Sequence, residues 1–284
     1  MPLGQSVVHP RSACPACKAP ISARDNIPVL SWLLLGGKCR HCKATISPRY
    51  AAVELLTAAL FALAYYVASE QSPINPWLLA AKYCVFSFLL IGLIFTDAET
   101  KLLPDLLTKP GIALGLLFSV LVPVEGPAGF FLRSWLHHGT NWRIFSLINS
   151  LAGAAIGAAF ILGIALFYQA LRGVEGMGMG DVKLMALIGA FLGMKMTLLV
   201  LMVGSLIGSV FGVFLILAVW RKRLARRRRK VPAEPVAAAR KRSWHSAMLI
   251  YRNFQIPFGV FLGIAALLAG FWGESAVRWY WGML

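Results

Sequence analysis

The sequence predicts an all-α fold in which a bundle of membrane-spanning helices follows a small polar segment. Of the 284 residues, 58% are hydrophobic and 14% are charged, whereas soluble domains are roughly 45–50% apolar. Several apolar runs approach the ~20 residues that a membrane-spanning helix needs. Only residues 1–49 are polar throughout, and they hold four of the five cysteines. We therefore divide the chain into a polar segment, 1–49, and a transmembrane domain, 50–284.

Seven apolar segments qualify as spans, and polar links separate most of them. In order they are Tyr50–Ala68, Pro76–Thr96, Leu106–Val124, Leu147–Leu171, Val182–Met194, Thr197–Trp220 and Pro257–Trp272. A helix over Val182–Met194 rises only about 20 Å, so it crosses the membrane only if it continues through Lys195. Residues 1–13 lack the apolar core of a signal peptide, so the internal spans are expected to direct insertion.

The positions of Lys and Arg orient these spans. With seven crossings, 23 of the 28 Lys and Arg residues lie on one side, which the positive-inside rule makes the cytoplasm. The polar segment then faces the cytoplasm, and the C-terminus lies outside. The run Arg221–Lys230 belongs to a basic cytoplasmic loop, 221–253, where it anchors the topology and can contact membrane lipids that carry negative charge. The net charge of +17 does not indicate nucleic-acid binding, because no base-stacking array accompanies it.

Two aspartates stand out among the eleven acids. Asp97 ends the second span, where the carbonyl end of a helix disfavours a carboxylate by a few tenths to ~1 kcal/mol. Asp181 follows the glycine-rich stretch Gly176–Gly180 and opens the fifth span, where the helix dipole alone could also explain an acid. Both lie at the cytoplasmic membrane edge, and acids at such positions are functional by default. Asp105 is expected to cap the third span, and Glu99 to be solvated.

Two facing carboxyl groups that share a proton can activate water and protonate a leaving amine, as in aspartic proteases. The helix dipole favours charge on Asp181 and disfavours it on Asp97. We therefore expect Asp181 to begin as the base and Asp97 as the acid, within a pair that titrates as a unit.

The four paired cysteines are Cys14, Cys17, Cys39 and Cys42. Four thiolates around one tetrahedral zinc ion would fold a segment whose apolar core is otherwise too small. Cytoplasmic placement argues against structural disulfides. Structural zinc is therefore the favoured interpretation, ahead of a redox pair of dithiols or of unligated thiols. Cys84, inside an apolar run, is expected to be a small buried hydrophobe.

Two segments resemble the active-site motifs of bacterial type IV prepilin peptidases, which are membrane aspartyl proteases of the Gly-x-Gly-Asp type. They are Thr96-Asp97-Ala98-Glu99-Thr100-Lys101-Leu102-Leu103-Pro104-Asp105 and Gly176-Met177-Gly178-Met179-Gly180-Asp181-Val182-Lys183. The resemblance also covers the paired cysteines, Arg49-Tyr50…Val53-Glu54-Leu55 and Ile256-Pro257-Phe258-Gly259. It maps the catalytic pair onto Asp97 and Asp181.

The resemblance implies an enzyme of the bacterial inner membrane that removes the leader peptide from type IV prepilins or type II secretion pseudopilins. Cleavage is expected on the cytoplasmic face, after a Gly and before an apolar residue, often Phe. Many family members then N-methylate the new amino terminus with S-adenosylmethionine. Glu54, Gly36 and Gly37 are candidates for that second site, or else an ordinary helix acid and turn glycines.

The chain departs from the family pattern in two places. Relatives usually begin with a further transmembrane helix, and here only Ser6–Pro10 matches the junction that follows it. Seven spans are therefore expected where the family has eight, in a truncated sequence or in a true variant. The link Arg221–Asn253 is also longer than in compact members of the family. Both departures lie away from the acid pair.

Two other functions stay open. A membrane thiol–disulfide oxidoreductase would use the two Cys-x-x-Cys pairs and would not need the aspartates. An ion-coupled transporter would use Asp97 and Asp181 as an ion site and would leave the mass of any substrate unchanged.

Overall fold

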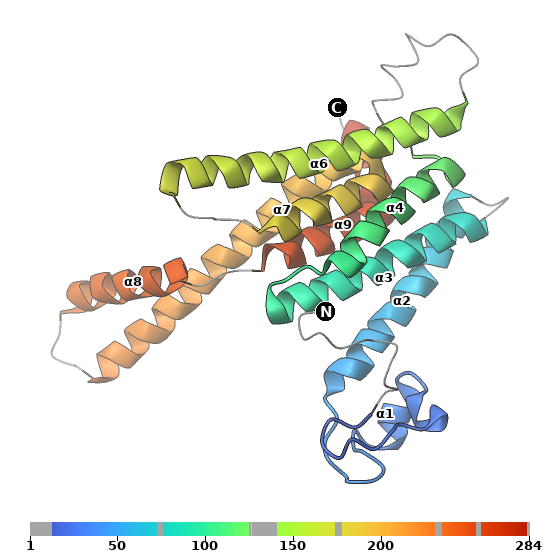
Figure 1. Cartoon of the computed structure of the whole chain (residues 1–284). Coiled ribbons are helices and arrows are strands. Elements are labelled where there is room, and N and C mark those ends of the chain that lie inside the picture. Colours follow the sequence, from blue (N-terminus) through green and yellow to red (C-terminus); the bar gives the residue numbers. More distant parts are fainter. Residues whose placement is uncertain are drawn as a thin grey trace.

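The computed structural model describes residues 13–72, 76–124, 126, 141–173, 178–230, 235–253 and 257–282. Within these ranges it contains helices and two isolated β-bridges but no strand, which confirms the all-α prediction (Figure 1). The elements are η1 Ala23–Asn26, α1 Leu30–Leu34, α2 Pro48–Gln71, α3 Pro76–Thr100, α4 Asp105–Leu121, α6 Trp142–Arg172, α7 Met179–Lys230, α8 Val236–Asn253 and α9 Phe258–Trp281.

Five of these helices, α2, α3, α6, α7 and α9, are long and apolar enough to cross a membrane. The chain is thus a multi-pass membrane protein. The seven predicted spans correspond to these helices, to the 17-residue α4 and to a division of α7 into two arms. A helix of the length of α4 rises about 26 Å, slightly less than the hydrocarbon thickness of a bilayer.

Local sequence signals set several helix ends. At the start of α2 the Ser47 side chain accepts the N–H of Arg49, and Pro48 occupies the first helical position. At the start of α6 the Asn141 side chain accepts the N–H of Arg143. The same helix ends at Gly173, whose φ of 68° is left-handed. Ser or Asn before a helix, Pro at its first position and Gly after its end are the residues that such geometries favour.

Helix α7 consists of two arms joined at Gly193, whose φ of 75° and ψ of 177° are not helical. Glycine allows this break because it has no Cβ to clash at positive φ. Gly157 of α6 lies against both Met185 and Thr197, which stand on opposite sides of Gly193. The two arms therefore pack against the same level of α6. The sequence put the end of the first arm at Met194 or beyond, but the break falls earlier because Gly193 tolerates this φ.

Asn149 of α6 satisfies backbone groups near this break. Its Oδ1 accepts the N–H of Met194 at 3.4 Å, and its Nδ2 donates to the carbonyl of Val124 at 3.2 Å. The side chain is only 1% exposed. Polar backbone at membrane depth has to find its partners within the protein, and Asn149 supplies two of them.

The apolar core lies between α3, the first arm of α7 and α9. Its largest fully buried side chains include Phe86, Leu90, Leu187, Phe191 and Leu262. The rings of Phe86 and Phe191 have their centroids 5.0 Å apart. This core fixes the relative positions of α3 and α7, whose ends carry the two predicted acids, and of α9, whose start contacts one of them.

The basic link at 221–253 contains two helices in its described part. Helix α7 continues to Lys230, and α8 returns beside it (Figure 1). The rings of Trp220 and Trp244 meet edge to face with centroids 5.9 Å apart. Lys, Arg and Ala are good helix formers, which explains why this link is regular.

Candidate active site and metal centre

Asp97 lies in the last turn of α3, and its residue is only 5% exposed. Its Oδ2 accepts a hydrogen bond from the N–H of Val260 at 3.1 Å. Val260 belongs to the first turn of α9, where the N–H groups have no partner inside the helix and carry partial positive charge. The start of α9 therefore supplies a donor to a carboxyl group that stands at the unfavourable end of its own helix.

Asp181 is the third residue of α7 and is partly buried. The positive end of the α7 dipole lies at this turn. The helix ends that carry Asp181 and Asp97 are neighbours, because Leu103 contacts both Gly180, next to Asp181, and Gly259, which contacts Asp97. The structure thus brings together two acids that are far apart in the sequence.

Two glycines make room for this meeting of helix ends. A Cβ at Gly259 would lie 2.8 Å from Oδ2 of Asp97 and 3.3 Å from Cδ1 of Leu103. A Cβ at Gly180 would lie 3.0 Å from Cβ of Leu103. Leu103, in the link between α3 and α4, therefore packs against glycines on both sides of the site. Residues 174–177, the first part of the glycine-rich stretch, lie outside the described residues.

Two other described acids near the site, Asp105 and Glu99, are engaged in ion pairs. Asp105 is the first residue of α4 and makes no side-chain cap. Its carboxylate pairs instead with Lys183, two residues after Asp181, and with Lys109 at 2.8 Å. The predicted capping role is therefore wrong, and Asp105 ties the start of α4 to the start of α7. Glu99 is exposed, as predicted, and pairs with Arg49 at 3.3 Å.

The arrangement can support proton transfer between two carboxyl groups and a water molecule. The N–H of Val260 bonds Oδ2 of Asp97 whether or not Oδ1 carries a proton. The assignment of Asp181 as base and Asp97 as acid therefore stays a prediction.

Sequence reasoning missed Val260 as a partner of Asp97. The available signal was Pro257 followed by an apolar run, which marks a helix start.

The four paired cysteines come together in one cluster. Their Sγ atoms all lie within 4.8 Å of one another. The Sγ atoms of Cys14 and Cys42 are 3.8 Å apart, and those of Cys17 and Cys39 are 4.0 Å apart. A tetrahedral ion with metal–sulfur bonds of about 2.3 Å separates its sulfurs by about 3.8 Å. The donor set therefore fits a four-thiolate metal site.

Two matching turns present these thiols. In each turn the first cysteine accepts, on its carbonyl, the N–H of a lysine that has a φ of 57°, Lys18 for Cys14 and Lys43 for Cys39. The flanking residues close each turn with an isolated β-bridge. The repeat Cys-x-x-Cys-Lys-Ala, which begins at Cys14 and again at Cys39, is a signal for this symmetry that sequence reasoning did not use.

The backbone of each turn prepares a thiolate. N–H groups within the first turn, led by that of Cys17, lower the pKa of Cys14 to about 6. The corresponding groups of the second turn, led by the N–H of Cys42, lower the pKa of Cys39. At Cys42 the N–H of Ala44 lowers the pKa, but the neighbouring thiols and burial outweigh it and raise the pKa to about 11. A bound cation would relieve this crowding of negative charge.

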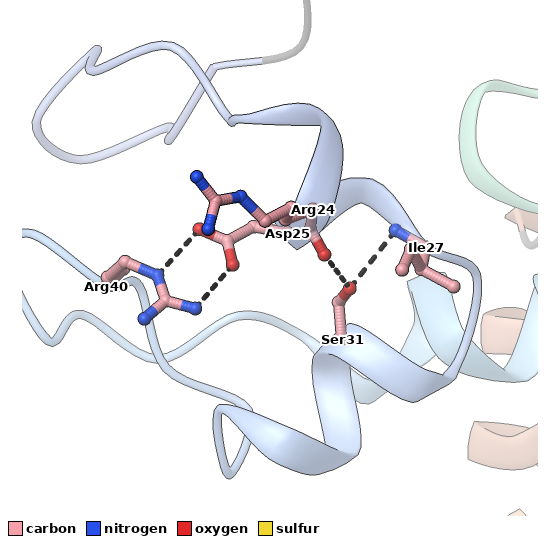
Figure 2. A network of polar contacts seen from close by, with 5 residues as sticks. All are labelled: Arg24, Asp25, Ile27, Ser31 and Arg40. Atoms are coloured by element: carbon pink, nitrogen blue, oxygen red, sulfur yellow. Dashed lines mark hydrogen bonds and ion pairs between the residues drawn. The ribbon is translucent and has the colours of Figure 1, made fainter.

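A polar network braces the second turn against η1 and α1 (Figure 2). Nε of Arg40 donates to Asp25 at 2.8 Å, and a second guanidinium nitrogen donates to its other oxygen at 2.6 Å. The Ser31 hydroxyl donates to the carbonyl of Arg24 at 3.0 Å and accepts the N–H of Ile27 at 3.1 Å. These contacts hold the cluster in a segment that has little apolar packing.

The residues suggested for a methylation site have structural roles here. Glu54 of α2 accepts the N–H of Val29 at 2.7 Å and so ties the cysteine segment to that helix. Gly36 and Gly37 have φ values of 60° and 66°, which a tight turn needs and side chains disfavour. Gly37 also packs against Trp32, since a Cβ there would lie 2.9 Å from the indole ring.

Comparison with known proteins places these sites in one family. Residues 1–68 match the Bacterial Peptidase A24 N-terminal domain, and residues 84–213 match the Type IV leader peptidase family. The "Prepilin leader peptidase/N-methyltransferase" of Aeromonas salmonicida (strain A449) is 38% identical over 275 residues, which cover 97% of this chain and 76% of that relative. The chain belongs to the type IV leader peptidase family.

Relatives of the same name are similar to this leader peptidase family member over most of its length. The one of Pseudomonas aeruginosa is 32% identical over 279 residues, covering 97% of this chain and 76% of the relative. The one of Neisseria gonorrhoeae is 36% identical over 208 residues, covering 73% and 64%. No solved structure matches the chain. The family resemblance drawn from the motifs is confirmed.

Proposed function

We propose that this leader peptidase family member removes the leader peptide from type IV prepilins or type II secretion pseudopilins, with Asp97 and Asp181 as its catalytic pair. The observation that carries the proposal is that these two acids lie on neighbouring helix ends, where α3 ends and α7 begins, beside the start of α9. Support also comes from the relatives, which are named prepilin leader peptidase/N-methyltransferase.

In this mechanism one carboxylate takes a proton from a water molecule, and the water oxygen attacks the scissile carbonyl carbon. The other carboxyl group gives its proton to the leaving nitrogen as the C–N bond breaks. The N–H of Val260 orients Asp97. Leu103, in the link that follows α3, packs against Gly180 next to Asp181 and against Gly259 at the start of α9.

The proposal also covers the orientation of the chain in the membrane, the metal of the cysteine cluster and the methyl donor. The Lys and Arg distribution favours a cytoplasmic location in the inner membrane for both the acids and residues 1–49, with 50–284 as the transmembrane catalytic domain. Zinc is the proposed metal of the cysteine cluster, because four thiolates in a reducing compartment suit it best. N-methylation of the new amino terminus, with S-adenosylmethionine as the methyl donor, is the proposed second activity.

The test is mass spectrometry of a prepilin co-expressed with the intact chain, with Asp97→Asn or with Asp181→Asn. We expect the intact chain to remove the leader, and each variant to cleave more slowly by a factor of about 10⁴, since members of a catalytic unit fail together. Glu99→Gln is the matched control, because this exposed acid at the same membrane edge pairs only with Arg49 in the described part of the chain. A further mass of about 14 Da, one methyl group, would report methylation.

The outcomes separate the candidate functions. Unchanged cleavage by both aspartate variants would exclude the acid pair. Loss of activity on replacing the cysteines, with the aspartates dispensable, would instead favour a thiol–disulfide oxidoreductase. An intact chain that leaves every tested prepilin at its full mass while moving ions would favour the transporter.

A further inference from the structure

A cavity of about 920 Å³ lies at the end of the bundle opposite to the two acids. Its walls come from α2, α3, α7, α9 and the chain that follows α4. Buried apolar side chains form its inner wall, among them Phe191, Met196 and Phe271, whereas Glu70 and Arg278 are exposed at its rim. This volume falls within the range of small-molecule binding pockets.

Lys82 of α3 is the unexplained group in this cavity. It lines the cavity and is only 6% exposed. It makes no ion pair or hydrogen bond through its side chain in the part of the chain that the structure describes. Lys82 lies about 22 Å along α3 from Asp97, so it has no part in the acid site. An ammonium group buried among membrane helices is costly unless an anion accompanies it.

The acids that line the cavity do not supply that anion. Glu274 pairs with Lys195 at 2.8 Å. Glu70 forms no ion pair within the described residues and is exposed to solvent. Arg278 adds a further cation at the rim, and its guanidinium donates to the backbone carbonyl of Glu274. Among the described residues, the cavity and its immediate partners thus hold three cations (Lys82, Lys195 and Arg278) and two acids (Glu70 and Glu274), and the buried cation, Lys82, has no ion-pair partner there.

We propose that this cavity binds an anionic glycerophospholipid, with the lipid phosphate at Lys82 and an acyl chain along the apolar inner wall. A phosphate group would neutralise Lys82, and the wall of Phe191, Met196 and Phe271 suits a hydrocarbon chain. Trp272, 49% exposed beside the rim, is a residue type enriched where lipid headgroups meet the acyl region. This site is separate from the two acids and from the basic link 221–253.

The test uses the full chain, delipidated in detergent, and follows its Tm by tryptophan fluorescence. Three additives are titrated: short-chain phosphatidylglycerol, phosphatidylcholine of the same chain length, and sodium phosphate. We expect phosphatidylglycerol to raise Tm, because a ligand that binds only the folded state stabilises it, and phosphatidylcholine to have a much weaker effect. In Lys82→Met the apparent Kd for phosphatidylglycerol should rise by about tenfold or more, the scale of one charged hydrogen bond.

Two control variants test whether the effect of Lys82→Met on lipid binding comes from the lost charge at this position. Lys82→Arg keeps the charge and should retain binding. Lys109→Met removes an exposed lysine at the other end of the bundle and should leave the Kd unchanged. Without lipid, Lys82→Met should unfold at the same Tm as the intact chain or higher, since a buried unpaired charge is removed.

Three results would overturn the proposal. The first is an equal Kd in the intact chain and Lys82→Met. The second is saturation by sodium phosphate alone with no gain from the lipid, which would identify a soluble anion as the ligand. The third is a large loss of Tm in lipid-free Lys82→Met, which would mean that Lys82 already pairs with Glu70 or Glu274.

Discussion

The acid pair and the cysteine cluster are held in opposite ways. Asp97 is 5% exposed and stands among packed helices. Between residues 13 and 47, by contrast, the only buried residues are Cys14, Ser31, Gly37 and Cys39, so no larger apolar side chain forms a core. Packing of the helix bundle holds the acid site in place. In the cysteine segment the dependence is reversed, because the cluster has to stabilise the residues around it.

Removal of the metal should have the largest structural effect, confined to the cysteine segment. Binding of zinc to small zinc domains contributes roughly 10–16 kcal/mol of apparent free energy, and residues 13–47 have little else to stabilise them. We expect chelation, or Cys14→Ser, to expose this segment to limited proteolysis while the helix content of the bundle persists. Metal content by mass spectrometry should fall in parallel.

Cys84→Ser is the matched control for Cys14→Ser. Cys84 lies in α3, outside the cluster, and is half-buried rather than fully buried as expected. Its replacement should change neither metal content nor the proteolysis pattern. A cysteine segment that stays protease-resistant after its metal is stripped would contradict the contrast between the two sites.

The substitution Gly259→Ala should disturb the acid site through packing alone. The new Cβ would lie 2.8 Å from Oδ2 of Asp97, so either the carboxyl group or the start of α9 must shift. A displacement of about 1 Å in a catalytic group can cost on the order of 10²-fold in rate, and we expect a loss of this size in prepilin cleavage. Metal content should stay at its normal level.

Gly208→Ala provides the comparison, since a Cβ there meets no atom nearer than 3.5 Å. It should cleave prepilin at the normal rate. Equal rates for Gly259→Ala and the intact chain would show that the acid site tolerates more displacement than its packing suggests.

The substitution Asn149→Leu tests how far the acid site depends on the distant break in α7. Leucine has a similar size but leaves the N–H of Met194 and the carbonyl of Val124 without their partner. Each unsatisfied buried group costs about 1–3 kcal/mol, so for these two groups we expect the free energy of unfolding to fall by about 2–6 kcal/mol. Residual folded protein should still cleave prepilin.

The neighbouring Ser150→Ala is the control for Asn149→Leu. The buried Ser150 hydroxyl has no hydrogen-bond partner among the described residues, so its removal should be nearly neutral in a thermal or denaturant unfolding measurement. Equal destabilisation by both substitutions would mean that the loss of unfolding free energy comes from altered packing, and not from the lost hydrogen bonds to Met194 and Val124.

The sequence indicated which acids and which cysteines group together, but it did not predict the contacts that surround them. Asp97 could be singled out because an acid at the carbonyl end of an apolar helix has no local benefit. The cysteines could be grouped because their spacing is specific. The donor from Val260 could not be predicted, because it depends on how α9 packs against α3, and side-chain periodicity in all-apolar helices does not show which helix each one meets.

The break in α7 illustrates the same limit. Gly193 sits in an apolar run that contains several other glycines, and only the packed structure distinguishes the one with positive φ. The ion pair of Asp105 with Lys183 was missed for a similar reason, since Lys183 lies on a different helix. Residue positions determined by local chemistry could be predicted from the sequence. Contacts between helices that are distant in the sequence could not.

The smallest expected effect, that of Arg40→Gln, tests whether polar contacts stabilise the cysteine segment in addition to the proposed metal. Arg40 hydrogen-bonds Asp25 through both carboxylate oxygens, and this contact lowers the pKa of Asp25. A lowered carboxyl pKa contributes stability above the ordinary Asp range, and that contribution disappears as the pH falls through the lowered pKa. At neutral pH the pair is therefore intact in the normal chain and absent in the variant.

Because the Arg40 side chain is 61% exposed, solvent and salt screen most of this attraction. We expect Arg40→Gln to speed metal loss to a chelator by only about twofold to threefold at low salt. The difference from the intact chain should shrink in 0.5 M salt, roughly threefold above physiological ionic strength. Lys38→Gln, which removes a nearby cation that forms no ion pair in the described segment, should match the intact chain. If Arg40→Gln instead lost its metal many times faster than the intact chain, the Arg40–Asp25 pair would be a major source of stability for the cysteine segment. The segment would then depend less on its metal, and it would differ less from the acid site, which packed helices hold.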